Sequence, residues 1–226
     1  MNLLAFETSS RVGSVALETR SGLHVREVAA PREQTGRLLA LTDELLSAAG
    51  IELEALRGIA FGRGPGSFTG LRVSAAVAQG LAAATGVPLA PVSSLLALAE
   101  RALRESGLER ALVCVDAHMG EVYSALAERR GGVVEIVGAE RLSAPADLAA
   151  PPAGPAWCAA GTGFAAHAAA LAGVASGAAE VLQNLEPSAA DLLPQAKRDL
   201  AAGRVTPPKS ALPVYLRDET AWRRGS

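Results

Sequence analysis

Alternating apolar and polar positions at the start of the chain predict three β-strands, LLAFET, SVALET and LHVREVA, joined by the turns SSRVG and RSG. Leucines at helical spacing follow within Arg32–Gly50, and the apolar segment RGIAFG is typical of a short buried strand. The glycine-rich segment FGRGPGSFTGLR then leads into a predicted helix over Thr69–Ala84. A strand in VPLAPVS and a helix over Leu95–Glu105 complete this half of the chain.

The second half of the chain repeats this plan. ALVCVDA, EVYSALAE and VVEIVGAE predict another meander, and AWCAAGTGFAAHAAAL is a weaker copy of IAFGRGPGSFTGLRVSAA. In this correspondence Glu7 matches Asp116, and Gly13 matches Gly120. The duplication predicts an α/β protein of two related lobes, each a mixed sheet flanked by helices.

The domain boundaries follow from the repeat and from the prolines near the end of the chain. We expect a first lobe of residues 1–106 and a second lobe of residues 107–205. Three prolines between Arg204 and Pro213 indicate a linker over residues 206–212. The segment 213–226, with a helix near Tyr215–Arg224, is expected to pack back on the first lobe.

Composition and charge narrow the function classes. The chain has 226 residues, half of them hydrophobic, which is enough for a large core. Its 21 Lys and Arg residues against 23 Asp and Glu residues leave a net charge of −2, so any RNA contact needs a partner. From the sequence we expect neither a secretory leader nor a membrane span, and Cys114 and Cys158 lie in apolar runs that suit a reducing compartment. The expected location is the cytoplasm.

The glycine-rich segment does not fit the common nucleotide or nucleophile motifs. A Walker loop needs a Gly-Lys pair, and the chain has none. A dinucleotide loop needs a third glycine, but Ser67 stands there when the motif starts at Gly62, and Thr69 when it starts at Gly64. A nucleophile elbow fails because Pro65 takes the place of its first glycine.

Two uses remain for this segment and the helix after it. The free N–H groups at the start of the helix offer a site for an anion. Alternatively, small residues at every fourth position would let a second helix approach closely, or would pack on the protein's own sheet. These small residues are Gly70, Ser74, Ala78 and Ala82.

The histidines do not form a metal motif, because His24, His118 and His167 are far apart in the sequence. A metalloprotease is therefore excluded on the motif, and we expect neither a metal nor another cofactor.

Four segments together carry a family resemblance: FETSSRVGSVAL, IAFGRGPGSFTGLR, VDAHMGEVYSA and PVYLRDETAW. In this order, and spanning nearly the whole chain, they resemble the TsaB family, the bacterial dimerisation subunits of the tRNA threonylcarbamoyladenosine machinery. The chain departs from many relatives at Ala117 and His118, where an arginine is usual. The resemblance implies the fold of actin, sugar kinases and Hsp70, which is ribonuclease H-like.

The resemblance also implies a non-catalytic role. The catalytic relative, TsaD, carries a metal-binding histidine pair, and a TsaE ATPase joins the complex. Together they form threonylcarbamoyladenosine beside the anticodon of tRNAs that read codons starting with A. The chain would therefore contact tRNA only through the complex, and a homodimer is an option when the chain is alone. The alternative is a nucleotide-dependent kinase or ATPase of the same fold, acting between the lobes.

The family's contact surface, carried onto this chain, covers the helix Glu33–Ala49, the glycine-rich segment and the helix that starts at Thr69. Phe68 would be an anchor at this interface or a plug that seats the loop on its own lobe. A vestigial nucleotide cleft would be marked by Glu7, Thr8, Ser9 and Asp116. The expected partner-interface residues are Leu38, Leu41, Gly64, Gly66, Ser67, Phe68, Thr69, Gly70, Ser74 and Ala78.

Overall fold

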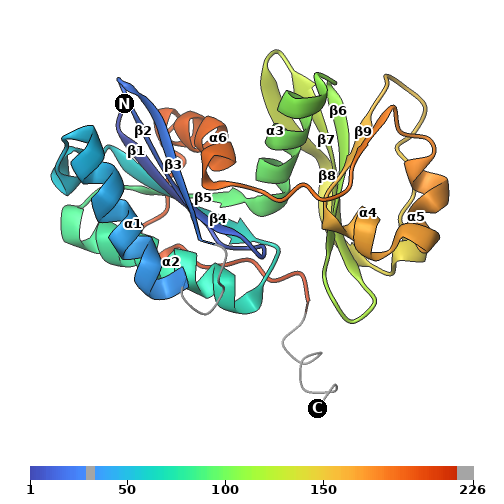
Figure 1. The fold of residues 1–226 in the computed structure, drawn as a ribbon. Helices are drawn as coiled ribbons and strands as arrows, with labels where there is room; N and C mark the ends of the chain where they lie inside the picture. The colour runs from blue at the N-terminus through green and yellow to red at the C-terminus, as the bar shows by residue number, and fades with distance from the viewer. Residues whose placement is uncertain (29–33, 218–226) are drawn as a thin grey trace. The chain divides into compact units, whose positions relative to one another are not determined.

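The computed structural model describes residues 1–28 and 34–217, which form two compact α/β units (Figure 1). The first unit consists of Met1–Ala97 and Pro187–Pro213, and the second of Leu98–Glu186 and Val214–Ser226. Within the described ranges, none of the helices has the length and apolar character needed to span a membrane.

The first unit is built on a five-stranded mixed sheet with the order β3-β2-β1-β4-β5. The first three strands form the expected antiparallel meander, and β4 and β5 continue from β1 in parallel. The strands are β1 Leu3–Glu7, β2 Gly13–Thr19, β3 Gly22–Val28, β4 Gly58–Gly64 and β5 Leu89–Ser93.

Helices cover both faces of this sheet (Figure 1). The helices α1 (Gln34–Ala49) and α2 (Phe68–Thr85) pack on the face that carries Phe6 and Phe61, because the leucines of α1 and the small residues of α2 point inward. The opposite face packs against α6 (Ala189–Ala201): a Cβ on Gly58 would lie 2.7 Å from the side chain of Leu200. Short 3-10 helices, η1 and η3, cover Leu53–Ala55 and Pro208–Ser210.

The second unit repeats the topology of the first, with the order β10-β9-β6-β7-β8. This repetition confirms the duplication and the α/β class. Strand β10 was not expected from the sequence pattern, and it occupies the place that β5 has in the first sheet. The elements are α3 Ser94–Ser106, which begins in the first unit, β6 Arg110–Asp116, β7 Val122–Arg130, β8 Val133–Ser143, η2 Pro145–Asp147, β9 Cys158–Ala160, α4 Thr162–Ala166, α5 Ala168–Ala175 and β10 Glu180–Leu182.

The unit boundaries differ from the expected ones after residue 186. Helix α6 belongs to the first unit, although the sequence placed it in the second lobe, because Leu192 and Leu193 bury against the first sheet. The expected linker 206–212 is also packed on the first unit. Its Thr206 bridges to β5, and the side-chain amide of Gln79 donates to the carbonyl of Ala211.

The start of the terminal segment lies on the second unit, not on the first as expected. The guanidinium of Arg217 is almost fully buried and donates to the carbonyl oxygen of His118 (3.2 Å) and to the carboxylate of Glu121. These partners explain the placement, because a buried cation needs acceptors. Residues 214–217 are not helical, and the rest of the helix expected near Tyr215–Arg224 lies outside the described residues.

Candidate functional site

The glycine-rich segment, from the end of β4 to the start of α2, packs closely against the end of β1 and the turn that joins β1 to β2. A Cβ at Gly62 would overlap the carboxylate of Glu7, and one at Gly66 would lie 2.5 Å from the Cβ and carbonyl oxygen of Ser9. Gly66 also has a φ of +159°, at the limit of what other residues adopt. These glycines are therefore needed because another part of the same unit fills the space where their side chains would be.

The contact continues at the start of α2. A Cβ at Gly70 would overlap the carbonyl oxygen of Thr8, whose hydroxyl donates to the carbonyl of Gly70 at 2.6 Å. The N–H of Ser67 donates to the carbonyl of Ser9 at 2.8 Å. Thr8 and Ser9 of the β1–β2 turn thus have hydrogen-bond partners in the loop and in the first turn of α2. The glycines therefore permit a close approach between two parts of the same unit, the glycine-rich segment and the β1–β2 turn.

The start of α2 is capped by the protein itself. The hydroxyl of Ser67 accepts a hydrogen bond from the N–H of Gly70 at 3.3 Å, which satisfies one of the free donors that an anion would use. Phe68 is half-buried, and the guanidinium of Arg72 lies 3.6 Å from the centre of its ring. Phe68 therefore keeps part of its ring exposed while it also packs locally.

Glu7 at the end of β1 is fully buried. Its carboxylate accepts hydrogen bonds from the N–H of Ser9 (2.6 Å) and from the hydroxyl of Ser94 (2.9 Å). Burial raises the pKa of Glu7 above its usual value, and these hydrogen bonds offset only part of that effect. The group that the kinase alternative would use as a base or metal ligand is thus enclosed and engaged in structural hydrogen bonds.

This burial predicts a pH-dependent stability. Between the pKa of the unfolded chain, about 4.5, and the raised pKa of the folded state, the folded protein binds more protons at Glu7. The contribution of Glu7 to stability therefore falls as the pH rises through this window. Glu7→Gln lacks this titration, so we expect its free energy of unfolding, relative to the unmodified chain, to increase with pH. Urea titrations between about pH 4 and pH 8 measure this difference.

A matched control for this experiment is Glu27→Gln, which changes an exposed carboxylate on β3 of the same sheet. We expect the free energies of unfolding of this variant and of the unmodified chain to run in parallel over the same pH range. If the free energy of unfolding of Glu7→Gln also runs parallel to that of the unmodified chain, Glu7 does not titrate as the structure implies.

Asp116 stands at the end of β6, the position that Glu7 has on β1, which confirms the correspondence of the two residues. Its carboxylate lies 3.0 Å from Nε2 of His167 and 3.2 Å from Nδ1 of His118, and it accepts from the N–H of His118. Burial alone would raise its pKa, but these hydrogen bonds and charges outweigh burial and lower it. His118 and Met119 adopt positive φ angles of 58° and 55°, in the turn that Arg217 contacts.

The contact surface expected from the resemblance consists of α1, α2 and the loop between β4 and α2, but several of its expected interface side chains lie in the core. Leu38 and Leu41 are 0% and 3% exposed, and Ser74 and Ala78 are both 0% exposed. The hydroxyl of Ser74 points to β4, where it lies 3.5 Å from the carbonyl oxygen of Gly62. The small-residue stripe of α2 therefore packs on the protein's own sheet, which is the second of the two uses that the sequence left open for it.

The loop residues divide between core and surface. Gly64 and Gly70 are buried and Gly66 is intermediate, whereas Ser67 and Thr69 are exposed. Of the expected cleft residues, Thr8 and Ser9 are 0% and 6% exposed. Within the described chain, His, Cys, Asp and Glu form no group of three or more that could hold a metal.

α1 and α2 also carry residues that are exposed, and we call four of them together the outer helix face. It comprises Leu39, Arg72, Ala76 and Gly80. Leu39 is 47% exposed, and a Cβ on Gly80 would meet no atom within 4 Å. This set was not among the residues expected from the sequence. Its signal was present, because Arg72, Ala76 and Gly80 also recur at every fourth position, two residues out of phase with the buried stripe.

Comparisons with known proteins agree with this fold. The model of the family TsaD, tRNA N6-adenosine threonylcarbamoyltransferase, matches residues 25–222. A crystal structure from Pseudomonas aeruginosa, of an uncharacterized protein with similarity to peptidase YEAZ, superposes with a TM-score of 0.88 at 39% identity, covering 96% of this chain and 99% of that one.

Two kinds of relative differ in how much of their own length matches this chain. The tRNA N6-adenosine threonylcarbamoyltransferase of Paracoccus denitrificans is 41% identical over 83 residues, which is 23% of its length. The tRNA threonylcarbamoyladenosine biosynthesis protein TsaB of Escherichia coli is 35% identical over 229 residues, covering 99% of this chain and 98% of the relative. These matches confirm the resemblance, and the chain belongs to the TsaB family of tRNA threonylcarbamoyladenosine biosynthesis proteins.

Proposed function

We propose that this chain is a non-catalytic subunit that binds and supports a TsaD-type transferase. The complex would form threonylcarbamoyladenosine beside the anticodon of tRNAs that read codons starting with A. The observation that carries the proposal is that the β1–β2 turn is occupied by its own unit. A nucleotide-using relative would turn Thr8 and Ser9 toward the phosphates. Here the Thr8 hydroxyl donates to the carbonyl of Gly70, and the carbonyl of Ser9 accepts from the N–H of Ser67. The site for catalysis would then be supplied by the partner.

The outer helix face is the proposed docking surface. Its small residues Ala76 and Gly80 leave room for a partner helix, and Leu39 adds apolar area that folding of the chain leaves exposed. The TsaD family model covers residues 25–222, which include α1 and α2, so a TsaD-type subunit would present a related pair of helices. Packing of the two related pairs would bury both outer faces.

Other members of the assembly would act through this complex. A TsaE-type ATPase would join the pair, and tRNA would bind to the complex, because a net charge of −2 gives this chain little attraction for RNA by itself. A second copy of the chain could occupy the outer helix face when the partner is missing. The assembly would work in the cytoplasm.

Reconstitution tests the proposal. We expect the purified chain to transfer no threonylcarbamoyl group to tRNA when alone, and to restore transfer when mixed with its TsaD-type and TsaE-type partners. The transfer is measured as the incorporation of labelled threonine into tRNA. The assay contains bicarbonate, ATP and the enzyme that makes the threonylcarbamoyl adenylate, from which the group is transferred. Transfer by the chain without the TsaD-type subunit would overturn the non-catalytic assignment.

The kinase or ATPase alternative receives no support from these findings. The full-length relatives are biosynthesis proteins of the TsaB type, and Glu7, which this alternative needs in an accessible position, is 0% exposed.

A further inference from the structure

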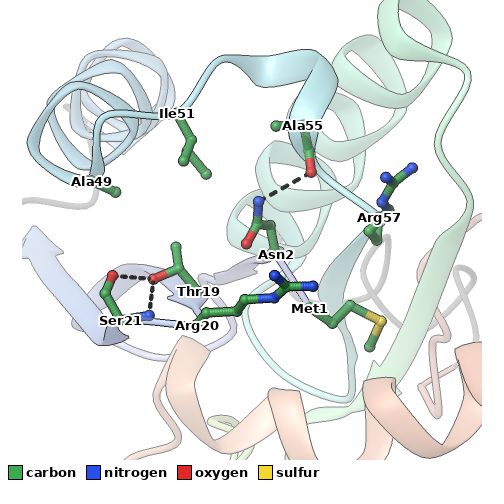
Figure 2. Close-up of a pocket in the computed structure, with 9 residues that line it drawn as sticks. All are labelled: Met1, Asn2, Thr19, Arg20, Ser21, Ala49, Ile51, Ala55 and Arg57. Carbon is green, nitrogen blue, oxygen red and sulfur yellow. Dashed lines mark hydrogen bonds between the residues drawn. The ribbon is translucent and has the colours of Figure 1, made fainter.

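A pocket of about 430 Å³ opens at the end of the first sheet, where β1 and β4 begin and the turn between β2 and β3 lies (Figure 2). Ile51 and Ala49 contribute an apolar wall from the end of α1. Asn2, Arg20 and Ser21 contribute polar groups on the other side. None of these residues belongs to the loop, the outer helix face or the Asp116 turn.

The charged side chains that line this pocket are both cationic. Arg20 comes from the β2–β3 turn, and Arg57 precedes β4. Neither guanidinium forms an ion pair within residues 1–28 and 34–217, whereas Arg110 and Arg130 are each paired with Glu128. A pocket lined by arginines and by no carboxylate attracts an anion.

Neighbouring polar groups give the pocket further donors in fixed positions. The side-chain amide of Asn2 donates one N–H to the carbonyl of Ala55 at 3.2 Å, and its second N–H is left for a ligand. The hydroxyl of Ser21 lies 2.7 Å from that of Thr19, which orders the turn that carries Arg20. Figure 2 shows Arg20 extending across the pocket toward Asn2.

We propose that this pocket binds the phosphate group of a nucleotide, with Arg20 and Arg57 as its cationic contacts. Arginine forms charge-assisted hydrogen bonds with phosphate oxygens, and the apolar wall at Ile51 offers a surface for the flat base. The volume lies within the range of pockets that hold small molecules. The nucleotide is either free or part of an RNA strand, since both present the same chemistry. This inference does not depend on docking of a transferase.

Calorimetric titration of the full chain at low salt tests the site with three probes: AMP, adenosine and a short single-stranded oligoadenylate. We expect AMP or the oligonucleotide to bind saturably, and adenosine, which lacks the phosphate, to bind at least roughly tenfold more weakly. Arg20→Gln and Arg57→Gln should each weaken the binding roughly tenfold. Arg26→Gln, which removes an exposed arginine of β3 outside the pocket, should leave it unchanged.

The probes also distinguish the sources of the phosphate. Binding of AMP assigns the pocket to a free nucleotide, and binding of the oligonucleotide alone assigns it to RNA. The proposal is overturned if neither probe binds, if adenosine binds as tightly as AMP, or if both glutamine variants bind as the unmodified chain does.

Discussion

The Gly70→Ala variant is expected to lose about 3 kcal/mol or more of the free energy of unfolding. The new Cβ would overlap the backbone carbonyl oxygen of Thr8, which cannot move away as a flexible side chain would. Relief requires α2 to shift from the sheet, and this would break the hydrogen bond from the Thr8 hydroxyl to the carbonyl of Gly70. Urea denaturation followed by circular dichroism measures the loss.

The same helix supplies the control for this experiment. A methyl group added at Gly80 of α2 would meet no atom within 4 Å, so Gly80→Ala is expected to stabilise the protein by about 0.5–1 kcal/mol through the higher helix propensity of alanine. Equal effects of the two substitutions would show that the close approach of the loop and the β1–β2 turn does not require glycine.

The second large effect is expected from Gly80→Arg in the proposed complex. An arginine at this position has open space in the isolated chain but would intrude between two packed helices. Overpacking of about 2 kcal/mol corresponds to roughly thirtyfold weaker binding of the TsaD-type subunit. Titration calorimetry of the two purified subunits measures the affinity, and the loss should appear equally in the reconstituted transfer reaction at limiting subunit concentration.

Gly173→Arg is the matched control, because Gly173 is an exposed helical glycine of α5 in the second unit, also with no atom near its Cβ position. This variant should bind the TsaD-type subunit as the unmodified chain does. If Gly80→Arg also binds normally while both variants remain folded, the outer helix face is not the docking surface. In that case the non-catalytic assignment still stands or falls on the reconstitution result.

The choice of Gly80 follows from the structure, because leucine at Gly70 or Ala78 would have been the natural test of the small-residue stripe. Ala78 is 0% exposed, and Gly70 contacts Thr8, so both substitutions would disturb the fold before any partner is involved. A loss of binding in such variants would report on stability and not on docking. Substitution at an exposed position separates these two effects.

Local patterns in the sequence were sufficient for the α/β class, the duplicated plan and most of the elements of the first unit. These patterns extend over only a few residues, so they can be recognised without knowledge of the fold. They are the alternation in LLAFET and SVALET, the helical spacing of leucines and the glycines at turns. The correspondence of Glu7 with Asp116 was also readable, because both lie at the end of a strand of the same type.

Long-range contacts decided the rest. The small residues of α2 form two stripes, and only the packing of α2 on β4 shows that Ser74 and Ala78 face inward while Ala76 and Gly80 face outward. Similarly, Arg20 and Arg57 are 37 positions apart and share a pocket only because β2 and β4 flank β1 in the sheet. The composition of a helix or loop determines that close packing is possible, but the choice of neighbour depends on which surfaces of the whole unit remain to be buried.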